Sequence, residues 1–184
     1  MAASLNDLGR AAIVLDTGAV SRGSGGQGTN KEKDARRALT QRGWIEGVVL
    51  LPENLFYNTT APGIILLLNK RKPAERRGQI MLINASGEFE KGRPKNFIPD
   101  AGIHKIAETY HAWKPVEKFA RLITLAEAEQ NDWNLSPSRY VDTGEAEQNR
   151  AVQSIIDDLA TLEADAAALD AELNGILKSL GYTL

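Results

Sequence analysis

Two apolar runs separated by a short polar segment constrain the fold more than any other feature of the sequence. Residues 45–51 and 63–69 are rich in Val, Ile and Leu, and each has the length and composition of a buried β-strand. About a dozen residues join them, too few for a crossover helix with its turns, so we expect the strands to pair antiparallel. The joining segment presents two adjacent aromatic residues, Phe56 and Tyr57, among amides and hydroxyls.

The neighbouring segments indicate that residues 1–86 form an α/β unit. The apolar run 11–15 is typical of a strand buried on both faces, and residues 79–84 suggest another strand. A helix is predicted over residues 30–42, with Asn30 as its N-cap and a glycine after its last residue. Strand–helix–strand order predicts a largely parallel sheet covered by helices, apart from the antiparallel pair.

Residues 87–144 have a less regular pattern, and we expect an irregular and helical tract there. Short helices are predicted over residues 103–111 and 125–131. Five aromatic residues are scattered through the tract, and we expect them to pin it onto the sheet. They are Phe97, Trp113, Phe119, Trp133 and Tyr140.

Residues 145–184 carry a heptad pattern. Apolar residues recur at alternating steps of three and four, which predicts a long C-terminal helix of the coiled-coil type. Because such a helix cannot bury a narrow apolar seam alone, we expect it to pack in a homodimer or against another subunit. Docking onto its own domain is the alternative. The seam consists of Val152, Ile155, Leu159, Leu162, Ala166, Leu169, Leu173, Ile176 and Leu180.

The composition excludes several classes of protein. At 42% hydrophobic and 25% charged residues, the chain falls in the soluble globular class. It has no cysteine, which excludes a disulfide framework, a thiolate nucleophile and a cysteine zinc site. We see no secretory signal and no apolar run near the ~20 residues of a membrane span, so we expect a cytoplasmic protein without a membrane partner.

The charge is distributed unevenly along the chain. Residues 1–144 hold 20 basic and 16 acidic side chains, whereas residues 145–184 hold 2 basic and 8 acidic ones. One basic cluster is a candidate for contacts with DNA phosphates, although solvated turn residues would look the same. It comprises Lys70, Arg71, Lys72, Arg76 and Arg77. A second basic cluster comprises Lys91, Arg93 and Lys95.

Residues 48–70 resemble closely the second half of the methyltransferase domain in modification subunits of type I restriction–modification systems. The resemblance continues through residues 78–86, 89–96 and 131–143. It implies the distal half of a Rossmann-like methyltransferase sheet with mixed parallel and antiparallel strands. Family members transfer a methyl group from S-adenosylmethionine to the exocyclic N6 amine of adenine in DNA.

Two motifs of that family are missing from these 184 residues. The family holds the adenine amine with an Asn/Asp-Pro-Pro-aromatic motif and S-adenosylmethionine with a glycine-rich turn, and neither occurs here. The resemblance therefore implies the C-terminal portion of a modification subunit, with no catalytic residue, no cofactor of its own and no activity alone. In a full complex its partners would be DNA, the specificity subunit and the restriction subunit. The alternative is a stand-alone truncated module for assembly or regulation.

The loop between the two apolar runs carries the candidate site residues. The resemblance implies that Phe56 or Tyr57 stacks on a flipped adenine, and such stacking contributes ~1–3 kcal/mol per base. Asn58 and Thr59 are placed to hydrogen-bond a base edge. Alternatively, Phe56 seals the edge of the sheet, and Asn58 and Thr59 are ordinary turn residues.

A glycine-rich segment keeps a third interpretation open. Residues Gly23–Gly28 satisfy G-x-G-x-x-G, which would suit a small nucleotide-binding domain. Seven residues separate them from the preceding strand, whereas the dinucleotide motif turns immediately. The resembling family has a proline at Asp16 and an aromatic residue at Ser21. We interpret His104 and His111 as surface residues, so no metal site is expected.

Overall fold

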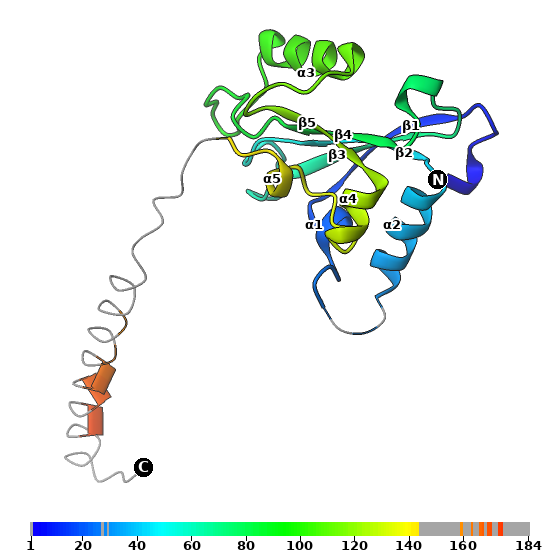
Figure 1. Cartoon of the computed structure of the whole chain (residues 1–184). Helices are drawn as coiled ribbons and strands as arrows, with labels where there is room; N and C mark the ends of the chain where they lie inside the picture. Colours follow the sequence, from blue (N-terminus) through cyan, green and yellow to red (C-terminus); the bar gives the residue numbers. More distant parts are fainter. Residues whose placement is uncertain are drawn as a thin grey trace. The chain divides into compact units, whose positions relative to one another are not determined.

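The computed structural model divides the chain into two units, Met1–Gly144 and Glu145–Leu184 (Figure 1). The structure describes residues 2–26, 28, 30–143, 159, 163, 166–167, 169–170 and 173–174.

A mixed five-stranded sheet organises the first unit, in the order β1-β3-β2-β4-β5 (Figure 1). The pair β2–β4 is parallel, and β1–β3, β2–β3 and β4–β5 are antiparallel. Strands β1, β2 and β4 therefore run in one direction, and their carboxyl ends lie at the same edge of the sheet. The strands are β1 Arg10–Asp16, β2 Ile45–Leu50, β3 Gly63–Asn69, β4 Gln79–Asn84 and β5 Ala120–Thr124.

The topology confirms one prediction and corrects another. Residues 45–51 and 63–69 do pair antiparallel, as the short connection required; Val48 faces Leu66 and Val49 faces Ile65. The expectation of a largely parallel sheet is wrong, because β3 returns between β1 and β2 and separates two strands that would otherwise be parallel neighbours. The mixed sheet implied by the family resemblance is confirmed.

Strand β1 lies at the edge of the sheet and is not buried on both faces. Its residues alternate, with Ala11, Ile13 and Leu15 against the core and the others exposed. Val14 is 57% exposed. The predicted two-sided burial is wrong: in the described part of the chain β1 pairs only with β3, and α3 reaches its second face only at Arg10, which bonds Tyr110.

Helices cover both faces of the sheet (Figure 1). Side chains from α1, α2, α4 and α5 contribute to one core cluster, and α3 packs against the other through Ile106 and Tyr110. The helices are α1 Gly18–Ser21, α2 Lys31–Gln41, α3 Asp100–Ala112, α4 Leu125–Gln130 and α5 Pro137–Tyr140, with short 3₁₀ helices at Ala2–Ser4 and Ala74–Arg76.

The helix predictions hold for α2, α3 and α4. The side chain of Asn30 accepts hydrogen bonds from the backbone amides of Glu32 and Lys33, so it is the N-cap of α2 as expected. The tract 87–144 was expected to be irregular and helical, yet β5 contributes a strand to the sheet itself. Residues 1–86 and 87–144 consequently share one sheet.

In the second unit, only part of the heptad seam lies among the described residues. Leu159, Leu169 and Leu173 are helical, and their side chains are 56%, 64% and 50% exposed. The remaining apolar members lie outside the described residues: Val152, Ile155, Leu162, Ile176 and Leu180. Among the helices that the structure describes, none has the length and apolar character to cross a bilayer.

Candidate functional site

The segment 51–62 leaves the carboxyl end of β2, so it lies at the edge where β1 and β4 also end. Its two aromatic residues have different environments. Phe56 packs against the core cluster on the α3 side, and its Cε2 atom would lie 2.7 Å from a Cβ atom at Gly63. Tyr57, by contrast, is 83% exposed. The structure thus places Phe56 as an anchor against the sheet and Tyr57 toward solvent.

The other candidates in this segment are polar and exposed. Thr59 Oγ1 accepts a 3.0 Å hydrogen bond from the amide of Ala61, which is an ordinary turn interaction. Asn58 is exposed and makes no hydrogen bond or ion pair within the described residues. Among the four candidates, Tyr57 and Asn58 are therefore the side chains without a partner in the described residues.

The loop is held from one side by the turn between Glu90 and Phe97. Lys95 Nζ donates to Asn54 Oδ1 at 2.9 Å and to the carbonyl of Thr59 at 3.2 Å. The backbone amide of Asn96 donates to the carbonyl of Asn54 at 3.0 Å. Asn54 has a positive φ of 54°, so the loop turns sharply where the two segments meet. Sequence reasoning had assigned no such support to the loop.

The first basic cluster lies at the opposite edge of the sheet, because residues 70–77 follow the carboxyl end of the antiparallel strand β3. Lys72 is buried, and its Nζ donates to the carbonyl of Gln79 at 2.8 Å. Burial lowers the pKa of Lys72 to about 8. The assignment of Lys72 to surface phosphate contacts is therefore corrected.

Arg76 is also engaged internally. Its guanidinium lies over the rings of Trp113 and Tyr110, at 4.4 and 5.3 Å from the ring centroids, and within 3.4 Å of a Glu46 carboxylate oxygen. The Lys70 ammonium donates to the carbonyl of Leu5 and lies over the ring of Trp44. Of the five cluster members, only Arg71 and Arg77 are exposed.

Glu46 is a buried carboxylate that the sequence did not single out as a packing centre. It accepts hydrogen bonds from Tyr110 at 2.6 Å and Asn69 at 3.1 Å, and Arg10 lies 3.5 Å away. A register irregularity between Ile45 and Gly47 reverses the alternation of β2, so Ile45 faces the α2 side and Glu46 faces α3. The only sequence signal was a carboxylate inside an apolar run.

In the glycine-rich segment, Ser24 and Gly25 are bonded to the protein's own groups. The amide of Gly25 donates to Asp132 Oδ2 at 2.7 Å, and Asp132 also pairs with Lys33 at 3.0 Å. The hydrogen bond from Lys33 lowers the pKa of the Asp132 carboxyl. Since Asn30 also accepts from the amides of Glu32 and Lys33, several amides that could bind a phosphate here already have partners. The dinucleotide motif has an acidic residue about 20 positions after the glycines, and here that residue is Glu46. Glu46 lies at the amino end of β2, at the other edge of the sheet.

A buried arginine connects this segment to the tract that follows α4. Arg36 Nε donates to the carbonyl of Trp133 at 2.6 Å, and Nη1 donates to the carbonyl of Ala19 at 3.1 Å. Its Nη2 donates to Ser24 Oγ at 2.9 Å. Asp132 and Trp133 both have positive φ, at 52° and 58°. Arg36 thus fixes the glycine-rich loop against the Asn131–Thr143 motif.

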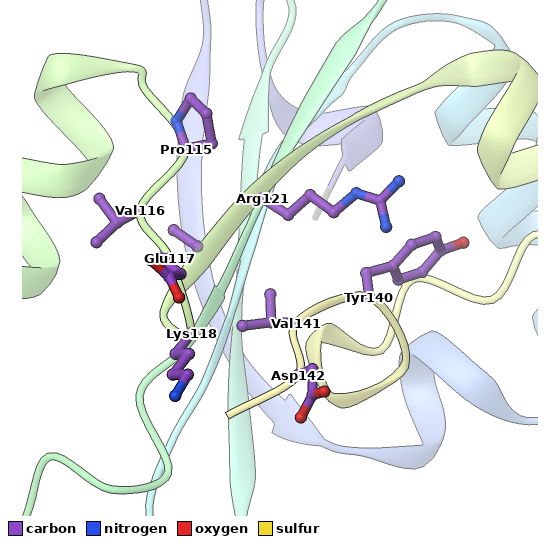
Figure 2. A pocket seen from close by; sticks show the side chains of 9 residues that line it. Pro115, Val116, Glu117, Lys118, Arg121, Tyr140, Val141 and Asp142 are labelled. Carbon is purple, nitrogen blue, oxygen red and sulfur yellow. The ribbon is translucent and has the colours of Figure 1, made fainter. Parts of the chain in front are cut away.

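A cleft of about 490 Å³ lies between β5, α5 and the segment that precedes β5 (Figure 2). None of the predicted site residues lines it. Two of its polar side chains are already paired: Arg121 with Glu127 at 2.7 Å and Tyr140 with the carbonyl of Asn134 at 2.7 Å. His104 and His111 are exposed on α3, and no group of three metal-ligating side chains occurs in the described part of the chain.

The mixed sheet, with β3 inserted antiparallel between β1 and β2 and an aromatic loop at its carboxyl edge, has a counterpart among methyltransferase subunits. A methyltransferase subunit of a type I restriction–modification system from Streptococcus thermophilus matches 73% of this chain and 27% of its own, with a TM-score of 0.65 and 39% identity. The chain belongs to the N-6 DNA methylase family, whose model matches residues 1–149.

Curated relatives extend the similarity over nearly the whole chain. The MjaVII methylase subunit of Methanocaldococcus jannaschii is 39% identical over 91% of this chain and 29% of its own length. The HindI methylase subunit of Haemophilus influenzae is 34% identical over 97% of this chain and 41% of its own. The chain thus spans well under half the length of these relatives. The EcoKI M protein shares the fold, with a TM-score of 0.59 at 15% identity.

Proposed function

We propose that this chain contributes the base-contacting loop and a subunit-assembly segment to a type I restriction–modification adenine-N6 methyltransferase, and that it does not methylate DNA alone. The observation that carries the proposal is the exposed Tyr57 on a loop braced at the carboxyl edge of a methyltransferase sheet. Ligands of open α/β sheets bind outside the carboxyl ends of the strands, so this edge is where a substrate base belongs.

Tyr57 would stack on the flipped adenine. Extruding a base from the duplex costs a few kcal/mol, and stacking on an aromatic face offsets ~1–3 kcal/mol of it. Asn58 lies beside Tyr57 and offers both a donor and an acceptor to the edge of the base. Phe56, packed against Gly63 at the start of β3, fixes the direction in which Tyr57 projects.

S-adenosylmethionine supplies the methyl group when it is bound in the complete enzyme. In the glycine-rich loop, the amide of Gly25 is not free for this cofactor, because it already donates to Asp132. We therefore assign no step of the methyl transfer to this chain. Cofactor binding and the grip on the adenine amine belong to the remaining part of the enzyme.

The exposed edge of β1 supports the proposal that a further part of the enzyme binds the cofactor and the adenine amine. Val14 is exposed, and within the described part of the chain the outer side of β1 has no neighbouring strand. An uncovered edge of seven residues is a template for further strands. We infer that the rest of the methyltransferase sheet pairs with this edge.

The assembly role rests on Leu159, Leu169 and Leu173, which are helical and exposed. We propose that the heptad seam packs against helices of the specificity subunit, in a cytoplasmic complex that also contains the restriction subunit and DNA. A homodimer through the same seam is the alternative arrangement.

Two measurements test the proposal. Titration of the chain alone with S-adenosylmethionine in a calorimeter should show no binding. When the chain is joined to the preceding portion of a relative's methylase subunit and combined with a specificity subunit, methyl transfer to adenine N6 should appear. Tight cofactor binding by the chain alone, or an inactive reconstituted enzyme that folds and assembles, would contradict it.

A further inference from the structure

The turn between Glu90 and Phe97 is a second positively charged surface, and it lies beside the loop that presents Tyr57. Glu90 and Phe97 pair through reciprocal backbone hydrogen bonds of 2.9 and 3.1 Å, which close the turn. Three cationic side chains occupy alternate positions within it. They are Lys91, Arg93 and Lys95.

This turn is attached to the Tyr57 loop at several points. Lys95 bonds Asn54 and Thr59, as described above, and the side-chain amide of Asn96 donates to the carbonyl of Glu53 at 3.1 Å. These contacts extend along the loop from Glu53 to Thr59, on both sides of Tyr57 in the sequence. The turn and the loop therefore form one surface at the carboxyl edge of the sheet.

The charge of the turn is not neutralised within the described residues. Lys91 and Arg93 are exposed and belong to no ion pair there, and the partners of Lys95 are an amide oxygen and a carbonyl oxygen. In the first basic cluster, by comparison, Lys72 is buried and Arg76 faces Glu46. A free cation beside a base-binding loop is the arrangement that attracts a phosphate.

The first basic cluster cannot serve the same nucleotide. Residues 70–77 and 51–62 lie at opposite ends of β2 and β3. Strands of six or seven residues separate the two edges by roughly 20 Å at ~3.3 Å per residue. The phosphates next to a base held at Tyr57 are within reach of the turn, and not of Arg71 or Arg77.

We propose that the Glu90–Phe97 turn binds the DNA backbone beside the target base, with Lys91 and Arg93 as phosphate contacts and Lys95 as the positioning residue of the Tyr57 loop. The proposal rests on the proposed function, since it identifies which surface of that site meets the DNA. It reassigns the phosphate contacts from the cluster at Lys70–Arg77 to the opposite edge of the sheet.

The phosphate contacts are tested by DNA binding of the full chain. Fluorescence anisotropy with a 20-base-pair duplex is measured over a series of salt concentrations for Lys91→Ala/Arg93→Ala and for the matched control Arg71→Ala/Arg77→Ala. Both double variants lose two positive charges from exposed positions. Each phosphate contact contributes about 0.9 to the slope of log K against log salt, so the first variant should lower the slope by about 1.8 and the control should leave it unchanged.

Three outcomes would overturn the phosphate contacts. An equal decrease of the salt slope in both double variants would mean that the DNA is attracted by net charge alone and not by this turn. A loss confined to Arg71→Ala/Arg77→Ala would place the contact at the other edge. Failure of the wild-type chain to bind the duplex at low salt would show that the turn is not a DNA-binding surface.

The positioning role of Lys95 is tested by amide hydrogen exchange. Lys95→Met removes both hydrogen bonds to the loop, so exchange of amides in residues 53–60 should become faster by tenfold or more. Lys91→Met removes the same charge four residues earlier, where no contact with the loop exists, and exchange should not change. Equal exchange in Lys95→Met and wild type would exclude the positioning role.

These measurements are independent of methyl transfer. An inactive reconstituted enzyme whose DNA binding still depends on Lys91 and Arg93 would overturn the proposed function and leave the DNA-binding turn intact. An active enzyme whose DNA binding does not depend on Lys91 or Arg93 would support the proposed function and overturn the DNA-binding turn.

Discussion

The hydroxyl of Tyr110, on α3, donates a 2.6 Å hydrogen bond to the buried carboxylate of Glu46, on β2. Arg10 donates to the same hydroxyl at 3.0 Å, and burial together with the Glu46 bond raises the pKa of Tyr110. The bond attaches α3 to β2, the strand that leads directly into the Tyr57 loop. Glu46 thereby links the architecture of the sheet to the candidate site.

Replacing Tyr110 with Phe should destabilise the fold by about 1–3 kcal/mol, because the buried carboxylate of Glu46 loses its shortest donor. Urea unfolding followed by circular dichroism measures the change. Tyr57→Phe is the matched control and should stay within ~0.5 kcal/mol of wild type, since its hydroxyl has no partner in the described residues. Equal stability of the two variants would contradict the role given to the Tyr110–Glu46 bond.

Lys72 should make stability depend on pH in the alkaline range. Its pKa falls from an ordinary 10.5 to about 8 in the folded chain, so between these values the unfolded state binds more protons than the folded state. Stability attributable to this group therefore rises with pH from about 8 to about 10.5, by on the order of 1–3 kcal/mol. Lys72→Met should lack this rise, which urea titrations of both proteins at several pH values would show. Parallel pH profiles would be inconsistent with the prediction.

Arg36→Met should destabilise the chain by roughly 3 kcal/mol, because the carbonyls of Ala19 and Trp133 lose a buried donor. Limited proteolysis should also become faster in the glycine-rich loop, residues 22–28, that Arg36 holds. Arg37→Met on the same helix is the control, since that side chain is 48% exposed and, within the described residues, its one ion pair is with Asp34. Unchanged proteolysis in Arg36→Met would argue against its role in the loop.

Tyr57→Ala in a reconstituted methyltransferase should lower methyl transfer by about ten- to a hundredfold, the equivalent of ~1–3 kcal/mol of lost base stacking. Stability should not change, because the side chain is exposed. Tyr57→Phe keeps the ring and should retain most of the activity. A wild-type rate in Tyr57→Ala, measured as methyl incorporation into duplex DNA, would remove Tyr57 from the site.

Substituting Leu159, Leu169 and Leu173 together with Gln should weaken association with the specificity subunit or with a second copy. Each leucine is at least half exposed, so burial of its side chain in an interface would stabilise the complex by about 1.5–3 kcal/mol. Sedimentation velocity measures the change. Glu163→Gln with Asp170→Asn, two exposed helical positions off the seam, is the control. Identical sedimentation of the triple variant and wild type would disprove the assembly role.

Local patterns in the sequence determined much of the fold. The apolar runs located β2, β3 and β4, the length of segment 51–62 required the antiparallel return, and Asn30 marked the start of α2. The motifs between residues 48 and 143 were sufficient to indicate the family. These features follow from spacing and turn chemistry over a few residues, and a linear sequence displays them directly.

Only the tertiary structure decided which of these residues share a surface. The insertion of β3 put the cluster at 70–77 and the Tyr57 loop at opposite edges, and it left β1 half exposed. The β2 irregularity turned Glu46 toward Tyr110 and not into the opposite core. Lys95 contacts the loop at Asn54, although the two residues are 41 positions apart in the sequence. Strand order and direction come from pairing between distant segments, which composition and periodicity along the chain do not encode.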